Sequence, residues 1–97
     1  MYRIEFHPEA ATEFNETVMW YEKQRPGLGT LVLAAMDRGL NSLAADPERW
    51  NFFVGNVRRH LLQRFPLAIL YEVTEPQIRV LAVMHLRRRP GYWRHRQ

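Results

Sequence analysis

The chain has 97 residues, of which 46% are hydrophobic and 25% are charged. This length and composition predict a single globular domain, residues 1–97, with no room for a second core. No apolar run approaches the ~20 residues that a membrane-spanning helix needs, and the N-terminal residues lack the apolar block of a signal peptide. The absence of cysteine excludes disulfide bonds and cysteine-ligated metals, and it fits a protein of the reducing cytoplasm.

Charge is divided unevenly along the chain. Residues 1–48 carry eight acidic and four basic side chains, whereas residues 49–97 carry ten arginines and two acids, Glu72 and Glu75. Arginine presents a planar, bidentate donor group that suits carboxylate and phosphate. A genome rich in G and C would favour arginine over lysine, but it would not divide the charge in this way. We therefore expect the C-terminal half to face an anionic partner.

The N-terminal half predicts a strand followed by two helices. Apolar and polar residues alternate over residues 2–6, which is typical of a half-buried strand. Pro8 suits the first turn of a helix, and apolar residues then recur at spacings of three and four up to about Gln24. A second helical pattern runs from about Leu28 to Ala45. The short connection between them predicts two antiparallel helices packed as a hairpin.

The C-terminal half predicts three strands joined by short turns: Val57–Leu61, Phe65–Val73 and Ile78–Leu86. The nearly continuous apolar run of the last one indicates a central strand that is buried on both faces. Residues 48–56 are predicted to form a loop. Its three aromatic side chains are more typical of a cluster that covers the core than of a platform for stacking bases.

This order of elements predicts an α+β two-layer sandwich, β-α-α-β-β-β, with the helical hairpin packed on a small, mainly antiparallel sheet. The three late strands form an antiparallel meander, and the first strand pairs with one edge of the sheet. The helices cover one face. The opposite face is expected to be free for function.

The residues present exclude several kinds of catalytic site. The four histidines, His7, His60, His85 and His95, are scattered without the spacing of metal ligands, so no metal and no cofactor are expected. Ser42 is the only serine and lies on an apolar helix, which argues against a serine triad. The chain has no glycine-rich phosphate loop.

What remains is a rim of arginines with one histidine and two aromatic residues near the end of the chain. His85 could act as a general acid or base, or it could hydrogen-bond locally and hold the start of the C-terminal segment. Tyr92 and Trp93 could stack on a base or pack that segment onto the sheet. The candidate residues for binding a target or another partner are Arg58, Arg64, Arg87, Arg88, Arg89, Tyr92 and Trp93.

The last two predicted strands and the segment after them resemble the RelE/ParE superfamily. The resemblance lies in residues 64–66 (Arg-Phe-Pro), residues 71–73 (Tyr-Glu-Val), residues 80–83 (Val-Leu-Ala-Val) and the run from His85 to Trp93. The order of elements agrees over nearly the whole chain. Members of this superfamily are toxins of type II toxin–antitoxin modules and are often labelled plasmid stabilisation proteins.

The resemblance implies one of two activities. RelE-like members are ribosome-dependent endoribonucleases that cut mRNA, and they position phosphate with arginines, lysines and a C-terminal tyrosine. In this chain Arg64, His85, Arg88 and Tyr92 would carry that chemistry without a metal. ParE-like members instead poison DNA gyrase by binding it. Either kind would form a hetero-oligomer with a cognate antitoxin, whose C-terminal segment would wrap the helical hairpin and lie along the sheet.

The nuclease pattern is poorly kept in this chain. The two positions at which RelE-like members carry arginines hold Ala68 and Leu86, and only Tyr92 falls on the family's tyrosine. Each lost cation would remove on the order of a few kcal/mol of transition-state stabilisation, although Arg64 or Arg87 could compensate from a neighbouring position. The sequence therefore favours a ParE-like gyrase inhibitor over a RelE-like nuclease. A module that has lost toxicity and only binds a partner is a third alternative.

Overall fold

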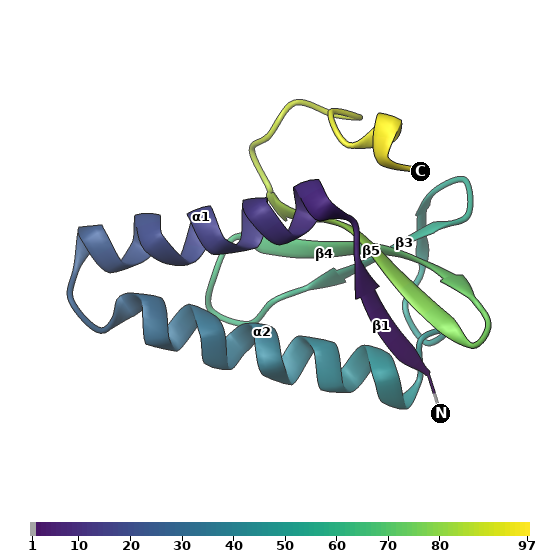
Figure 1. The fold of residues 1–97 in the computed structure, drawn as a ribbon, viewed down its shortest axis with the longest axis horizontal. Coiled ribbons are helices and arrows are strands. Elements are labelled where there is room, and N and C mark those ends of the chain that lie inside the picture. The colour runs from purple at the N-terminus through teal and green to yellow at the C-terminus, as the bar shows by residue number, and fades with distance from the viewer. Residues whose placement is uncertain (1) are drawn as a thin grey trace.

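The computed structural model describes residues 2–97, which form two helices, five strands and a basic C-terminal segment (Figure 1). In chain order the elements are β1 (Arg3–Phe6), α1 (Pro8–Gln24), α2 (Leu28–Ala45), β2 (Phe52–Val54), β3 (Val57–Leu61), β4 (Leu67–Thr74) and β5 (Gln77–His85), followed by a short 3-10 helix, Arg94–Arg96. No helix in the described part of the chain is both long and apolar enough to cross a membrane.

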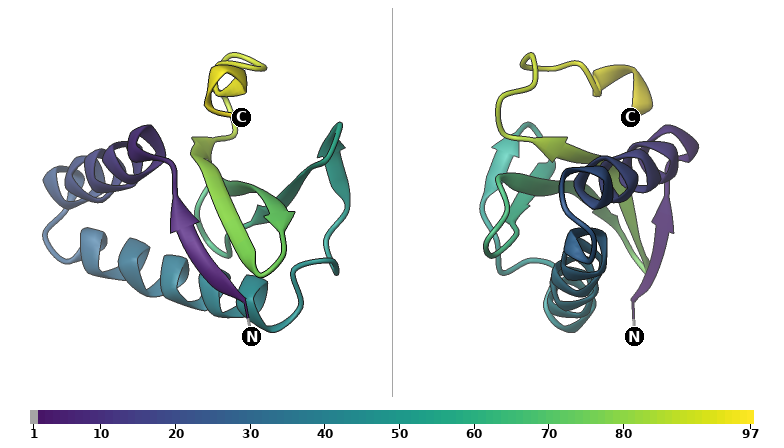
Figure 2. Two further views of the ribbon diagram at one scale, coloured as in Figure 1. Left: turned by 45° about the vertical axis from the view of Figure 1, so that its right-hand side comes forward. Right: turned by 90° about the vertical axis from the view of Figure 1, so that its left-hand side faces the viewer.

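The strands form one sheet in the order β1-β5-β4-β3-β2. β1 lies parallel to β5 at one edge, and each other neighbouring pair is antiparallel. The two helices lie side by side against one face of this sheet (Figure 2). The predicted α+β sandwich is confirmed, and β5 is the buried strand that its apolar run indicated.

One element differs from the prediction. Residues 48–56 are not all loop, because Phe52–Val54 forms β2 and pairs with β3 at the sheet edge. The order is therefore β-α-α-β-β-β-β. Gly55 and Asn56 make a two-residue turn between the two strands, and Gly55 has a positive φ of 54°. Such turns join neighbouring strands into tight hairpins, so the sequence did carry a signal for this strand.

The helix boundaries follow from local chemistry. Pro8 opens α1, where a missing N–H costs nothing, and His7 Nδ1 accepts a hydrogen bond from an N–H of the first turn at 3.0 Å. α2 follows Gly27 and has no side-chain cap of its own. Instead, the Glu22 carboxylate of α1 accepts the N–H groups of Gly27 and Gly29. The hairpin thus places a negative charge at the positive end of α2.

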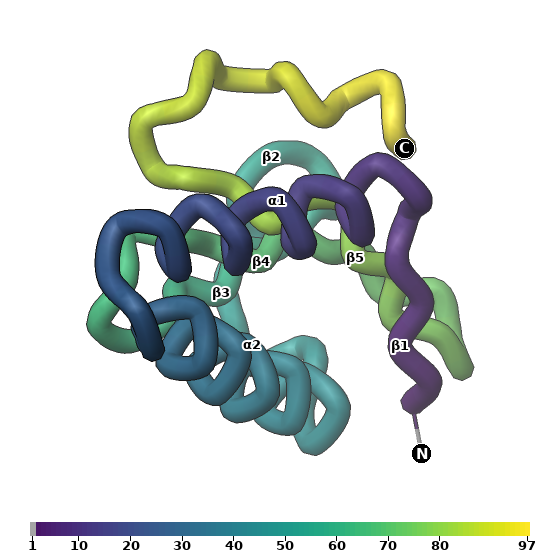
Figure 3. Tube along the Cα trace, turned by 60° about the vertical axis from the view of Figure 1, so that its left-hand side comes forward, coloured from purple at the N-terminus to yellow at the C-terminus, as the bar shows by residue number. Residues whose placement is uncertain are grey.

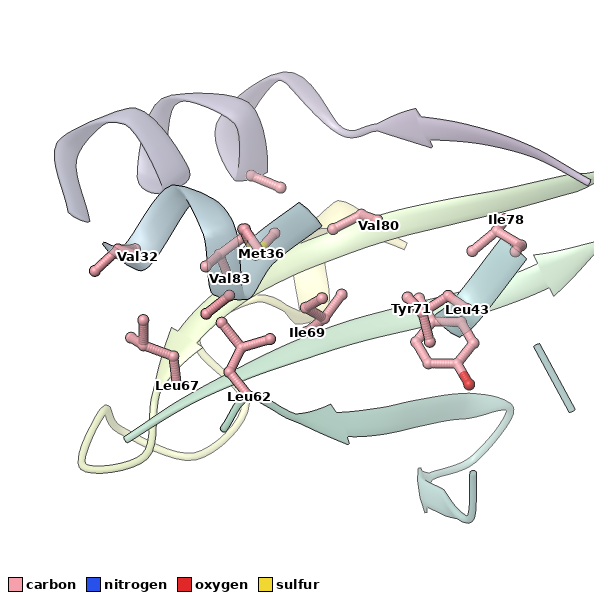
Figure 4. Packing of buried hydrophobic residues seen from close by; sticks show 12 residues of the cluster. Val32, Met36, Leu43, Leu62, Leu67, Ile69, Tyr71, Ile78, Val80 and Val83 are labelled. Carbon is pink, nitrogen blue, oxygen red and sulfur yellow. The ribbon is translucent and has the colours of Figure 1, made fainter. Parts of the chain in front are cut away.

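The main core lies between the helices and the sheet (Figure 4). Gly39 sits where α2 comes closest to the sheet, since a Cβ there would lie 2.9 Å from the Leu62 side chain. Tyr71 crosses the core and donates a hydrogen bond to the Pro47 carbonyl at 2.7 Å, while burial raises its pKa to about 12. The fully buried members include Val32, Met36, Leu43, Ile69, Tyr71, Ile78 and Val80.

A second core covers the opposite face, which was expected to be free. The tail, which we define as residues 86–97, turns back after β5 and runs towards the start of α1 (Figure 3). It places Trp93, only 1% exposed, against side chains of β3, β4 and β5. These are Val57, Ala68, Leu70, Leu81, Ala82 and Met84. The expectation of a free face is therefore wrong, because the tail buries the middle of that face.

Candidate functional site

The tail is held by a network centred on Glu13, an acidic residue of α1. One Glu13 oxygen accepts hydrogen bonds from Arg96 and from the Val83 N–H, both at 2.9 Å, and the other accepts from the Tyr92 hydroxyl at 2.5 Å. Arg96 also donates to the Leu81 carbonyl at 3.0 Å. The Arg96 and Glu13 side chains are 8% and 13% exposed, so this ion pair is nearly buried.

The network continues the hydrogen bonding of β5 at the point where β1 ends. β1 pairs with β5 as far as Val80, whose carbonyl accepts the His7 N–H at 2.9 Å. Beyond it, the Leu81 carbonyl and the Val83 N–H lie on the same strand with no further residue of β1 beside them. Unpaired backbone groups are costly when buried, and the Arg96 and Glu13 side chains satisfy these two.

Tyr92, which the resemblance placed at the tyrosine of RelE-like members, contributes to this network through its hydroxyl. Burial and the hydrogen bond to the Glu13 carboxylate raise its pKa well above its ordinary value. Arg88 lies over the ring, with its guanidinium carbon 4.1 Å from the ring centroid. A half-buried hydroxyl that donates to a carboxylate is a poor general acid or base near neutral pH. Tyr92 therefore fits tail attachment better than proton transfer.

The four candidate nuclease residues do not gather at one place. Arg88 and Tyr92 are in contact on the tail side of the sheet. The alternation of β5 places His85 on the helix side with Val83, and its Nδ1 accepts the Arg87 N–H at 3.1 Å. Arg64 lies in the exposed turn between β3 and β4, with a positive φ of 74°.

The two positions that lack the nuclease arginines are apolar in three dimensions as well as in sequence. Ala68 is fully buried in the second core, beneath the tail. Leu86 is 45% exposed at the start of the tail. Neither position therefore supplies a positive charge that could contact a phosphate.

Of the remaining predicted binding residues, Arg58 and Trp93 make contacts within the chain and the other four are exposed. Arg58 is used within the chain: it donates to the Glu48 and Trp50 carbonyls and lies 3.9 Å from the Phe52 ring centroid. Trp93 is buried, which corrects its place among the surface contacts. Arg64, Arg87, Arg88 and Arg89 are exposed, and within residues 2–97 none of them forms an ion pair.

Beside the tail, the sheet face is hollowed into a groove of about 370 Å³. Two arginines that sequence reasoning missed, Arg59 and Arg94, lie at this groove together with Arg88. The other lining residues are Phe53, Val54, Leu61, Met84, Leu86, Pro90, Gly91 and Trp93. Alternation along β3 puts Arg59 on the opposite face of the sheet from Arg58, whereas Arg94 reaches the groove because the tail turns back over the sheet.

The described residues hold no cluster of three or more His, Asp or Glu side chains that could bind a metal ion. The side chains that line the groove are instead mainly arginines and apolar residues. Exposed guanidinium groups surround aromatic and aliphatic side chains, which suits recognition of an anionic partner.

Comparisons with known proteins bear on the fold. No family model matches the chain, and no curated protein matches it. Among solved structures, it is similar to a chain from the "Chromosomal ParDE TA system from P. aeruginosa", with a TM-score of 0.76 over 88% of this chain and 96% of that one, at 17% sequence identity. The protein has the fold of a chain from a ParDE toxin–antitoxin system, which confirms the fold predicted from its resemblance to the RelE/ParE superfamily.

Proposed function

We propose that this protein is the toxin of a type II toxin–antitoxin module and acts as a ParE-like inhibitor of DNA gyrase. Its structural likeness to a chain of a ParDE system supports the toxin–antitoxin assignment. A cognate antitoxin would neutralise it by forming a hetero-oligomer with it. The protein would act in the cytoplasm, where gyrase works, and without a cofactor.

We favour gyrase over mRNA as the target because of the residues at the positions where a RelE-like nuclease would have its catalytic groups. Ala68 is a buried methyl group under the tail, and the Tyr92 hydroxyl is bound to Glu13. Cleavage of RNA requires cations aimed at the phosphate whose charge develops in the transition state. A binder requires only an exposed surface of complementary charge, and the arginines of the tail provide one.

A RelE-like, ribosome-dependent endoribonuclease is the competing function. The contact between Arg88 and Tyr92 favours it, because it brings two of the four candidate groups together. His85 would have to approach from the other side of the sheet. This alternative therefore requires a rearrangement of the tail that releases Tyr92 from Glu13.

Induction of the protein in growing bacteria separates the two functions. Pulse labelling of DNA and of protein synthesis should show that DNA synthesis fails first, because gyrase poisoning damages replicating DNA. Co-expression of the gene encoded beside it should restore growth. Protein synthesis that stops first, with mRNA cut at defined codons, would contradict the gyrase proposal and support the nuclease.

A further inference from the structure

A second hollow, of about 220 Å³, lies between α2 and β3, and we call it the α2–β3 hollow. It is on the helix side of the sheet, because the ring of His60 in β3 would lie 3.4 Å from a Cβ placed at Gly39 of α2. No aspartate or glutamate lines it. Its apolar lining is Ala35, Gly39, Leu61 and Leu62, and its polar lining is Arg38, Ser42, His60 and Gln63. The activity proposed above makes no use of these four polar side chains.

His60 brings an imidazole with an unsatisfied nitrogen to the α2–β3 hollow. Its Nδ1 is buried and has no hydrogen-bond partner within the described chain. Its Cδ2 atom is the one that faces Gly39, so the edge of the ring that carries Cδ2 and Nε2 is turned towards α2. One nitrogen of a neutral imidazole is a donor and the other is an acceptor. Because nothing can accept a proton from the sealed Nδ1, the favoured tautomer has its proton on Nε2, which offers a donor to the hollow.

The charge around the α2–β3 hollow is positive. Arg38 is exposed, and within residues 2–97 it forms no ion pair. Arg49 adds a second positive charge from the other side of His60: it lies over the Trp50 ring, 5.3 Å from the centroid, and Trp50 packs edge-on against the imidazole. Burial, and then the charge of Arg49, lower the pKa of His60, so its ring is neutral near neutral pH. Two arginines without an acidic residue in the lining favour an anion.

The donors at the α2–β3 hollow suit a phosphate group better than a carboxylate. They come from three places: α2, β3 and the turn that follows β3. A carboxylate presents its acceptors in one plane, whereas a phosphate group presents three or more strong acceptor oxygens around a tetrahedron. A guanidinium group can bind two of these oxygens at once. No aromatic ring other than the imidazole lines the hollow, so it offers no platform on which a nucleobase could stack.

We propose that the α2–β3 hollow binds a phosphate group, either as inorganic phosphate or as the phosphate of a small monoester. Arg38 pairs with its charge, and the Ser42 hydroxyl, His60 Nε2 and the Gln63 amide donate hydrogen bonds to its oxygens. The bound group joins α2 to β3 and so stabilises the packing of the helical hairpin on the sheet. The inference goes beyond the proposed function, because it assigns a small ligand to the opposite side of the sheet from the tail. It is tested by direct binding in the absence of gyrase, so its failure and the failure of the gyrase proposal are distinguishable.

The test titrates the full chain with inorganic phosphate near neutral pH and at constant ionic strength, and it follows backbone amide shifts. The amides of Gly39, Ser42 and Gln63 should shift and saturate. Arg38→Gln should weaken the binding about tenfold or more. The matched control, Arg25→Gln, removes an exposed arginine at the end of α1 and should bind as the wild type does. Equal binding by the two variants, or shifts confined to the arginines of the tail, would overturn the proposal.

Thermal unfolding gives a second readout. Phosphate should raise the unfolding temperature of the wild type, because a ligand that binds only the folded state stabilises it, and it should raise that of Ser42→Ala less. Chloride at the same ionic strength should have no such effect, and equal stabilisation by both salts would contradict a specific site.

A parallel titration with ribose 5-phosphate identifies the source of the phosphate group. Tighter binding of the sugar phosphate, with shifts of the same amides, would support a monoester as the ligand, whereas equal binding would support free phosphate. Failure of both to saturate at millimolar concentration would overturn the proposal, as would binding of an oligonucleotide without binding of either.

Discussion

Glu13 and Arg96 form an ion pair of 2.9 Å across 83 positions of sequence, and this pair attaches the end of the chain to the first helix. Each side chain also bonds a backbone group of β5. The pair therefore joins three elements: the tail, the sheet and α1. Removal of one partner of a nearly buried pair leaves the other charge without compensation, which costs far more than the loss of an exposed pair.

Glu13→Ala should lower the free energy of unfolding by about 3 kcal/mol, because the buried Arg96 and the Val83 N–H lose their partner. Urea unfolding followed by circular dichroism measures this change. The matched control is Glu9→Ala, which removes an exposed contact with His95 at 2.9 Å and should change stability little. Equal effects of the two variants would show that the buried ion pair stabilises the fold no more than the exposed contact does.

Trp93→Ala should destabilise the protein by about 3 kcal/mol, because it leaves a large cavity in the second core. The indole is 1% exposed and contacts the sheet face opposite the helices. The neighbouring residue Arg94 is the control, since its side chain is exposed and Arg94→Ala leaves no cavity in the second core. Denaturant unfolding of both variants checks the prediction, and a harmless Trp93→Ala would show that the tail is not part of the folded core.

Arg64→Gly should stabilise the protein by about 1 kcal/mol. Arg64 has a φ of 74°, a left-handed backbone conformation that disfavours side chains with a Cβ and suits glycine. Thermal unfolding measures the gain. Arg87→Gly, at an exposed arginine whose φ is not positive, serves as the comparison and should not stabilise. A loss of stability in Arg64→Gly would mean that this side chain makes a contact worth more than the strain.

Stability should fall as the pH drops below about 6.5, in part because of His60. Burial, and then the charge of Arg49, lower its pKa from 6.5, and its Nδ1 is buried without a hydrogen-bond partner in the described chain. A histidine with a lowered folded-state pKa binds its proton more readily when unfolded. It therefore contributes stability above the unfolded pKa that is lost as pH falls towards the folded pKa.

His60→Phe keeps an aromatic ring beside Trp50, whose centroid lies 4.4 Å from that of His60, and removes the titration. Its stability should decline less steeply than that of the wild type as the pH falls below about 6.5. Unfolding by urea over a series of pH values measures both profiles. Parallel profiles would show that His60 does not titrate differently in the folded and unfolded states.

Local patterns predicted most of the fold. The 3.6-residue periodicity and Pro8 predicted a helix with the bounds that α1 has in the structure. The apolar run of residues 78–86 predicted that β5 would be a central strand. These signals are strong because each depends on neighbours in sequence. β2 was missed because three residues are too short to show alternation, although Gly55 and Asn56 marked its turn.

The candidate site was predictable only in part, because it depends on contacts between distant residues. The sequence singled out Arg88 and Tyr92, but nothing near Glu13 indicated that its carboxylate would meet Tyr92 and Arg96. Arg94 likewise reaches the groove only because the tail turns back over the sheet. The buried position of Trp93 follows from the same turn. Such long-range contacts leave no periodic signal in one sequence.

Supercoiling of relaxed plasmid by purified DNA gyrase is the measurement that tests the proposed activity most directly. The purified chain should inhibit the reaction, and the product of the adjacent gene should restore it. Tyr92→Phe, assayed at a temperature where it stays folded, should inhibit as the wild type does, because the hydroxyl attaches the tail and takes no part in proton transfer. Unaffected gyrase, together with mRNA cleavage in a translating extract that is lost in Tyr92→Phe, would contradict the account.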